Sequence, residues 1–239
     1  MTKKIQVCFN TNQFVNYSNN NQTIVVIVDI LRATTVISTA FENGIKAIIP
    51  VKSLEETLKY KNFKNHILAA ERNTLPIEGF DYGNSPFHYI NANINGKTLV
   101  LTTTNGTKAI HLAKNHKVIT ASFLNIDAVH SFLMNQNTNI IILCSGWKGL
   151  FNLEDTIFAG ALAKKILKNK KFDSNCDSLN AAVDLYSIAK NNLFQYLENS
   201  SYRKRNKSKE IIKDTHFCLN PTITSEIVPI FKDGKLVKI

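Results

Sequence analysis

Short apolar runs alternate with helix-like segments along most of the chain. The apolar runs predict strands, and the segments between them have the spacing and capping residues of helices. Strands are predicted at residues 23–28, 47–50, 67–70, 98–102, 118–120 and 140–144, and helices at residues 33–43, 53–61, 107–114, 127–134 and 153–167. Strands that alternate with helices in this way are typical of an α/β fold with a largely parallel or mixed sheet.

A polar stretch, residues 168–177, interrupts this pattern and is the best candidate for a linker. Beyond it the pattern predicts two helices and a β-hairpin, at residues 178–190, 193–199 and 227–231 with 236–239. The hairpin is predicted because Asp233-Gly234 is a pair typical of tight two-residue turns. We therefore divide the chain into residues 1–167, which carry the motifs described below, and residues 168–239, which complete the fold.

The composition excludes several classes of protein. The chain has 239 residues, enough to bury a core without disulfides or a structural metal. It has no run of about 18 apolar residues, so we expect no membrane span. Residues 1–10 lack a small-residue cleavage site, and this predicts a cytoplasmic protein. The four cysteines are scattered without a CxxC pair, which favours reduced thiols over a zinc site or a disulfide framework.

The formal net charge is +11, and residues 161–239 hold most of it, with 15 Lys and Arg against 8 Asp and Glu. One basic cluster consists of Arg203, Lys204, Arg205, Lys207 and Lys209. Such a cluster can bind a nucleic-acid backbone, but no aromatic residues alternate with its cations as in a base-stacking groove. We therefore favour a solvated loop and helix start at this cluster, and a positive potential that attracts a small multiply charged anion.

Candidate chemistry lies where four predicted strands end, the edge at which ligands bind in open α/β sheets. At the first of these ends, Asp29 directly follows the strand at residues 23–28, and Arg32 stands three residues further on. An Asp at this place can bind a hard cation, and an Arg can bind a phosphate or sulfonate through two hydrogen bonds. An ion pair between Asp29 and Arg32 that closes the turn is the alternative.

The second strand end carries Glu71 and Arg72, and a long loop follows them up to Asn84 and Ser85. Glu71 follows the strand at residues 67–70, so its carboxylate can face Asp29 across the end of the sheet. Two carboxylates at short range need a cation or a shared proton, and Mg²⁺ is the simplest cation for this purpose. Ordinary turn chemistry is the alternative for the loop.

The third strand end runs into hydroxyl and amide side chains, in the sequence Thr103-Thr104-Asn105-Gly106-Thr107. Gly106 allows a close approach of the backbone to a ligand, and the N–H groups at the helix start can donate to an oxyanion. The sequence is neither GxGxxG nor a Walker motif, so it gives no support to nucleotide binding. Helix capping alone is the alternative explanation for these residues.

The fourth strand end is Cys144-Ser145-Gly146, followed by Glu154 and Asp155 at the start of the next predicted helix. Glu154 or Asp155 can supply a further carboxylate to a metal, or the two acids can simply complement the helix dipole. Cys144 is a candidate nucleophile by position. The sequence places no His to activate it, so a buried thiol is the preferred interpretation.

Taken in order, these motifs resemble the 2-phosphosulfolactate phosphatase family. The resemblance rests on Asp29-Ile30-Leu31-Arg32-Ala33-Thr34-Thr35, Glu71-Arg72, Gly79-Phe80, Gly83-Asn84-Ser85-Pro86, Thr103-Thr104-Asn105-Gly106-Thr107, Cys144-Ser145-Gly146, Leu153-Glu154-Asp155 and Ala159-Gly160. It covers residues 24–160 clearly and the remainder by length and layout. One departure is Ala70, where the family often has Gly before the Glu-Arg pair.

The resemblance implies two α/β subdomains with the active site between them, Mg²⁺ as cofactor and a small phosphorylated sulfonate as substrate. On this hypothesis the catalytic residues are Asp29, Arg32, Glu71 and Asp155, and Asp29, Glu71 and Asp155 hold the metal. The substrate is bound by Arg32, Arg72, Asn84, Ser85, Thr104, Asn105, Gly106, Thr107 and Gly146. Arg32 and the N–H groups of residues 105–107 hold the phosphate, and Arg72, Asn84 or Ser85 the sulfonate or carboxylate end.

Several alternatives remain open from the sequence. The attack on phosphorus can come from Asp29 itself or from a metal-activated water, because Leu31 breaks the DxDx[TV] pattern of haloacid-dehalogenase-type phosphatases. The substrate can be another small phosphorylated acid, and a non-catalytic protein that binds anions or nucleic acid is the alternative from a different class. The oligomeric state and the pathway of the product, coenzyme M biosynthesis or another, are also open.

Overall fold

The computed structural model describes residues 2–17, 23–72 and 75–239, without the side chains of residues 72, 75 and 76. Its strands are β1 (Lys3–Cys8), β2 (Thr23–Val28), β3 (Ala47–Pro50), β4 (His66–Arg72), β5 (Leu75–Pro76), β6 (Thr98–Thr102), β7 (Lys117–Ala121), β8 (Asn139–Cys144), β9 (Phe172–Asp173), β10 (Pro229–Lys232) and β11 (Lys235–Lys238). They form one open sheet in the order β5-β4-β6-β3-β11-β10-β7-β2-β8-β1-β9. The predicted α/β class with a mostly parallel sheet is confirmed.

The sheet consists of two parallel groups of strands that an antiparallel hairpin joins. Strands β4, β6 and β3 form one parallel group, and β7, β2, β8 and β1 form the other. Between them, β11 pairs with β3 through Leu236 and Ile48, and β10 pairs with β7 through Ile230 and Ile119. The predicted hairpin therefore connects the two groups. The division of the chain at residue 167 stays a prediction.

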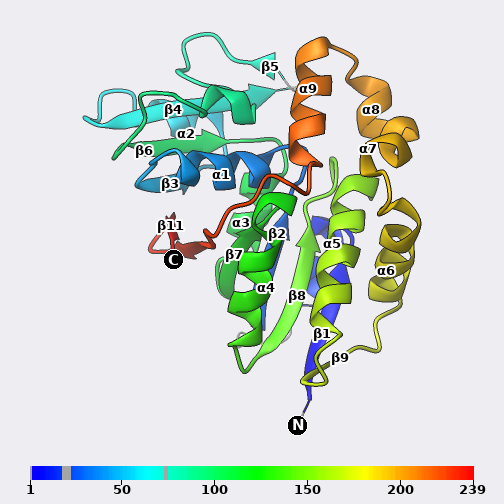
Figure 1. Ribbon diagram of the computed structural model, residues 1–239. Coiled ribbons are helices and arrows are strands. Elements are labelled where there is room, and N and C mark those ends of the chain that lie inside the picture. The colour runs from blue at the N-terminus through cyan, green and yellow to red at the C-terminus, as the bar shows by residue number, and fades with distance from the viewer. Residues whose placement is uncertain (1, 18–22, 73–74) are drawn as a thin grey trace.

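Helices cover both faces of the sheet (Figure 1). They are α1 (Ala33–Glu42), α2 (Leu54–Leu58), α3 (Gly106–Leu112), α4 (Ile126–Met134), α5 (Leu153–Ile166), α6 (Asp177–Ala189), α7 (Leu193–Tyr196), α8 (Ser201–Arg205) and α9 (Lys209–Cys218). Every residue of β2 is buried, because alternate side chains such as Val26 and Ile27 belong to core clusters on opposite faces. This explains why the central strands read as continuous apolar runs rather than alternating ones.

Helices α5 and α6 pack closely on one face of the sheet. A Cβ atom at Gly160 would collide with the backbone carbonyl of Ala182, so only glycine permits this approach. Helix α5 begins after Asn152, where the sequence predicts it, and its first turn carries Glu154 and Asp155. The close packing fixes the position of α5 and therefore of these two acids.

Two segments differ from the expectation. At the basic cluster, exposed cations and a helix that begins at Lys209 agree with the expected solvated loop and helix start, but the sequence did not predict that this helix, α9, extends to Cys218 or that Ser201–Arg205 form α8. The expected linker at residues 168–177 contains β9, which pairs with β1. In Figure 1 the arrows of β4 and β8 both point toward α9, so α9 lies near the carboxyl ends of strands from both parallel groups. Among the described residues, no helix has the length and apolar character needed to cross a membrane.

Candidate active site

A cavity of about 210 Å³ lies at the carboxyl ends of β2, β4, β6 and β8. It is lined by Asp29, Leu31, Glu71, Asn84, Thr103, Thr104, Asn105, Gly146, Trp147, Lys148, Asn152, Glu154, Tyr202, Arg205 and Asn206. Six of the predicted site residues are therefore in the wall: Asp29, Glu71, Asn84, Thr104, Asn105 and Gly146. The four strand ends, which are far apart in the sequence, meet at one place.

Asp29 and Glu71 are the two strand-end carboxylates of this cavity, and both are more than nine-tenths buried. The backbone N–H of Ala33 donates to Asp29 Oδ1 at 3.3 Å, and the N–H of Gly106 also donates to this carboxylate. The pKa of Asp29 is raised to about 6, mainly by burial and also by the nearby charge of Glu71, although the hydrogen bonds from Ala33 and Gly106 act in the opposite direction. The two carboxylates therefore line the same cavity and interact electrostatically, as the sequence predicts.

Glu154 is a third carboxylate in the wall, with 3% of its surface exposed. Asn152 Nδ2 donates to Glu154 Oε1 at 3.3 Å, whereas Glu154 Oε2 has no hydrogen-bond partner among the described residues. Burial raises the pKa of Glu154 to about 7. The side-chain carbonyls of Asn84 and Asn152 also lack partners within the described part of the chain. The cavity therefore offers several oxygen atoms that the protein itself does not use.

Asp155 is placed differently from the expectation that it faces a metal. Its Oδ1 accepts the N–H of Ile30 at 2.8 Å, and its Oδ2 accepts from Asn152 Nδ2 at 2.9 Å and from the N–H of Gly146 at 3.2 Å. The side chain is 1% exposed and stands behind the wall of the cavity. Asp155 thus ties the end of β2 to the loop after β8, and burial raises its pKa well above the usual range.

Arg32 and Ser85 also lie behind the wall. The guanidinium of Arg32, which is 4% exposed, forms an ion pair with the buried Asp214 of α9. The hydroxyl of Ser85 donates to the other oxygen of Asp214 at 2.7 Å. Arg32 therefore pairs with a residue that the sequence reasoning missed. The sequence does carry a signal for this helix, because its buried positions recur at helical spacing. These positions are Ile211, Asp214, Thr215 and Cys218.

The backbone N–H groups at the start of α3 donate hydrogen bonds to oxygen atoms of the protein itself. The N–H of Gly106 donates to Asp29, and the N–H of Thr107 donates to Thr103 Oγ1 at 3.2 Å. A Cβ atom at Gly106 would lie 2.8 Å from Ala33 Cβ and 2.9 Å from Asp29 Oδ2. Gly106 therefore allows the backbone to approach Asp29, where the sequence reasoning expected the approach of a ligand. Thr104 and Asn105 remain in the wall.

Two cations stand in the wall that the sequence reasoning did not select. The charged groups of Lys148 and Arg205 lie over the ring of Trp147, 4.7 Å and 3.7 Å from its centre. The backbone N–H of Lys148 donates to Asn105 Oδ1 at 3.2 Å, which ties this loop to the third strand end. Arg72 ends β4, and its side chain lies outside the described residues.

Cys144 is fully buried at the end of β8, and burial raises the pKa of its thiol well above the usual range. A thiol in such surroundings is a poor nucleophile, because the reactive form is the thiolate. The interpretation of Cys144 as a buried thiol is confirmed.

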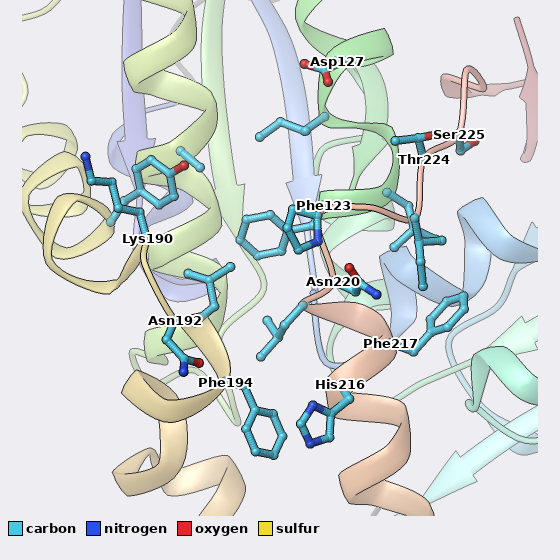
Figure 2. Close-up of a pocket in the computed structure, with 18 of the residues that line it drawn as sticks. Phe123, Asp127, Lys190, Asn192, Phe194, His216, Phe217, Asn220, Thr224 and Ser225 are labelled. Carbon is cyan, nitrogen blue, oxygen red and sulfur yellow. The ribbon is translucent and has the colours of Figure 1, made fainter.

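A second, larger hollow of about 970 Å³ lies between α5, α7 and α9 (Figure 2). Figure 2 shows the rings of Phe194 and His216 side by side, and their centres are 3.5 Å apart. Within the described part of the chain, none of the predicted site residues lines this hollow. Its acids, Asp127 and Glu226, do not stand at strand ends, so we place the active site in the smaller cavity.

The fold and the cavity define the class of this protein: an open-sheet α/β protein with buried carboxylates at the ends of parallel strands. Such a site suits a divalent cation and a small anion. The chain matches the family model of 2-phosphosulpholactate phosphatase over residues 9–234. It belongs to this family.

Curated relatives agree with this assignment. The chain is 37% identical to a protein of Caldanaerobacter subterraneus subsp. tengcongensis over 231 residues, which is 95% of each chain. It is 37% identical to a Thermotoga maritima protein over 212 residues, covering 89% of this chain and 90% of the relative. A Clostridium beijerinckii protein is 35% identical over 246 residues, covering 98% of each chain. All three carry the name "Probable 2-phosphosulfolactate phosphatase".

Proposed function

We propose that this protein is an Mg²⁺-dependent phosphatase that hydrolyses 2-phosphosulfolactate to sulfolactate and phosphate. The observation that carries the proposal is the pair of buried carboxylates, Asp29 and Glu71, which face one cavity from two different strand ends. The names of the relatives support the choice of substrate.

The oxygen donors of the cavity fit magnesium better than zinc. Mg²⁺ commonly binds one or two carboxylates and completes its shell with water and substrate phosphate. Asp29 and Glu71 supply two carboxylates, and the unpartnered carbonyl of Asn84 supplies a further oxygen. The described residues contain no cluster of three or more His, Cys, Asp or Glu with metal-binding geometry, as an all-protein zinc cage would require. When bound, Mg²⁺ neutralises charge that develops on the phosphoryl oxygens.

These contacts change two of the roles that the resemblance implies. We assign the metal to Asp29 and Glu71, and we assign Asp155 as a positioning residue because its two oxygens accept three hydrogen bonds. Arg32 likewise acts through its ion pair with Asp214, which fixes the turn that carries Asp29.

Glu154 is suited to donate a proton to the leaving group. Its Oε2 has no partner among the described residues, and its pKa of about 7 keeps a large fraction protonated at neutral pH. In the hydrolysis a water oxygen bonds to phosphorus, the bond from phosphorus to the C2 oxygen breaks, and that oxygen takes a proton from Glu154. A proton that the attacking water loses then returns Glu154 to its protonated form. We favour water over Asp29 as nucleophile, because backbone N–H groups hold the Asp29 carboxylate in place.

The test is phosphate release from 2-phosphosulfolactate, 2-phospholactate and 3-phosphoglycerate, with Mg²⁺ and with EDTA. We expect release that requires Mg²⁺ and is fastest with the sulfonate. Asp29→Asn should lower it by at least about a hundredfold, and Glu198→Gln, on an exposed residue that does not line the cavity, should leave it unchanged. A faster reaction with another substrate would overturn the choice of substrate. Binding of these compounds without turnover of any of them would overturn the proposal that the protein is an enzyme.

A further inference from the structure

The loop after β8 presents Lys148 on a tight turn. Trp147 and Leu150 exchange two backbone hydrogen bonds of 2.9 Å and 3.0 Å, so the chain reverses between them. Lys148 and Gly149, the two residues at the tip, have φ angles of +53° and +78°. A left-handed conformation is unfavourable for lysine, where glycine or asparagine is usual in such turns. The turn therefore holds Lys148 in a costly conformation next to the cavity.

Arg205 reaches the same cavity from α8, which belongs to a distant part of the chain. Its guanidinium lies over the Trp147 ring, 3.7 Å from the centre, and this cation–π contact limits the orientations that the arginine can take. Helix α8 is anchored by Tyr202, which is 4% exposed and also lines the cavity. The hydroxyl of Tyr202 has no hydrogen-bond partner among the described residues.

The charges of the wall are arranged unequally. Asp29 and Glu71 stand at the ends of β2 and β4, and Glu154 stands in the first turn of α5. The cations Lys148 and Arg205 lie instead over the ring of Trp147. A metal ion held by Asp29 and Glu71 would account for the phosphate of the proposed substrate. The rest of the proposed substrate carries a carboxylate and a sulfonate, and two more negative charges need donors or cations to leave water.

We propose that Lys148 and Arg205, held on Trp147, form the subsite that binds the carboxylate and sulfonate end of the substrate, with Tyr202 as a neutral donor. This proposal rests on the proposed function and specifies which residues select the sulfonate. The guanidinium of Arg205 can bind two sulfonate oxygens at once, and the ammonium of Lys148 acts as a point charge for the carboxylate. This subsite takes over the role that the sequence suggested for Ser85, because the Ser85 hydroxyl donates to Asp214 instead.

The experiment compares the wild type with Arg205→Ala in two measurements. Calorimetry measures binding of sulfolactate and of lactate in the presence of Mg²⁺, and steady-state kinetics measures phosphate release from 2-phosphosulfolactate and from 2-phospholactate. Loss of a charged hydrogen bond predicts that Arg205→Ala weakens sulfolactate binding and raises KM for the sulfonate substrate by about tenfold or more. The kcat and the kinetics with 2-phospholactate should change by less than about threefold, because that substrate has no sulfonate.

Lys204→Ala is the matched control, since it removes an exposed cation from the same helix without touching the cavity. Arg205→Lys should recover part of the sulfolactate affinity, which a merely structural role of Arg205 would not predict. Equal losses for sulfolactate and lactate, or no loss for either, would overturn the subsite. If the wild type binds sulfolactate through Arg205 but releases no phosphate, the proposed function fails and the subsite stands.

Discussion

Arg32 and Asp214 form a buried ion pair across 182 positions of the chain, and the pair joins the first turn of α1 to α9. The carboxylate of Asp214 also accepts a hydrogen bond from Ser85, so three segments meet at one side chain. Removing one partner of a buried pair leaves an uncompensated charge. The stability of the turn that carries Asp29 therefore depends on a helix near the other end of the sequence.

Asp214→Ala should lower the free energy of unfolding by about 3–5 kcal/mol, because the charge of Arg32 stays buried without its partner. The double variant Arg32→Met with Asp214→Leu should lose less than this. Urea unfolding of Asp214→Ala measures this loss, and urea unfolding of Arg32→Met, Asp214→Leu and the double variant measures the coupling. Additive losses would contradict the importance of the pair.

The affinity for a metal ion should distinguish the role of Asp29 from that of Asp155. Asp29→Asn should weaken the affinity for Mn²⁺, measured by electron paramagnetic resonance as a substitute for Mg²⁺, by about tenfold or more. Asp155→Asn should change this affinity by less than about threefold, because we assign Asp155 no direct contact with the metal. It should lower the melting temperature instead, since an amide nitrogen would face the N–H of Ile30 or Gly146. An equal loss of metal binding in both variants would return Asp155 to the set of ligands.

The metal-free protein should be more stable at pH 5 than at pH 8. Burial raises the pKa of Asp29 from 3.8 to about 6 and that of Glu154 from 4.5 to about 7, so the folded state binds protons that the unfolded state releases. This contribution is full below the unfolded pKa values and is lost as the pH rises through 6 and 7. Glu154→Gln should remove a part of it on the order of 3 kcal/mol. Thermal melts in EDTA at several pH values measure how stability changes with pH. The same pH dependence in Glu154→Gln as in the wild type would contradict the contribution of Glu154.

Gly106→Ala should lower activity more than stability. The added methyl group would press on Ala33 Cβ and on Asp29 Oδ2, and it would displace a carboxylate that we assign to the metal. We expect at least about a tenfold loss of kcat/KM, since small displacements of reacting groups have large effects on rate. Lys108→Ala, on the exposed side of α3, is the control. Normal kinetics in Gly106→Ala would show that this packing is not critical.

Much of the fold could be predicted because the relevant signals are local. The apolar runs of β2, β3, β6 and β8 mark strands buried on both faces, and the polar residues that follow them stand at the edge where the cavity forms. The types of residue at these ends, such as Asp29 and Glu71, already indicate the chemistry.

The remaining parts depend on contacts between distant residues. Nothing near Arg32 in the sequence shows that Asp214 is its partner, so a guanidinium bound to a carboxylate was expected to bind phosphate. Arg205 is exposed, as its place in the basic cluster predicts, but only the fold brings it to Trp147. The sequence predicts that the N–H groups of residues 106 and 107 bind a ligand, but in the structure Asp29 and Thr103 accept from them.

The hairpin of β10 and β11 has a consequence for the order of folding. It supplies the pairing between β3 and β7, so the two parallel groups can form a single sheet only after residues 229–238 have been synthesised. Asp29 follows a strand of one group and Glu71 lies in a strand of the other. On the ribosome, the two carboxylates therefore come into their final register late, when the growing chain already contains every other strand of the sheet.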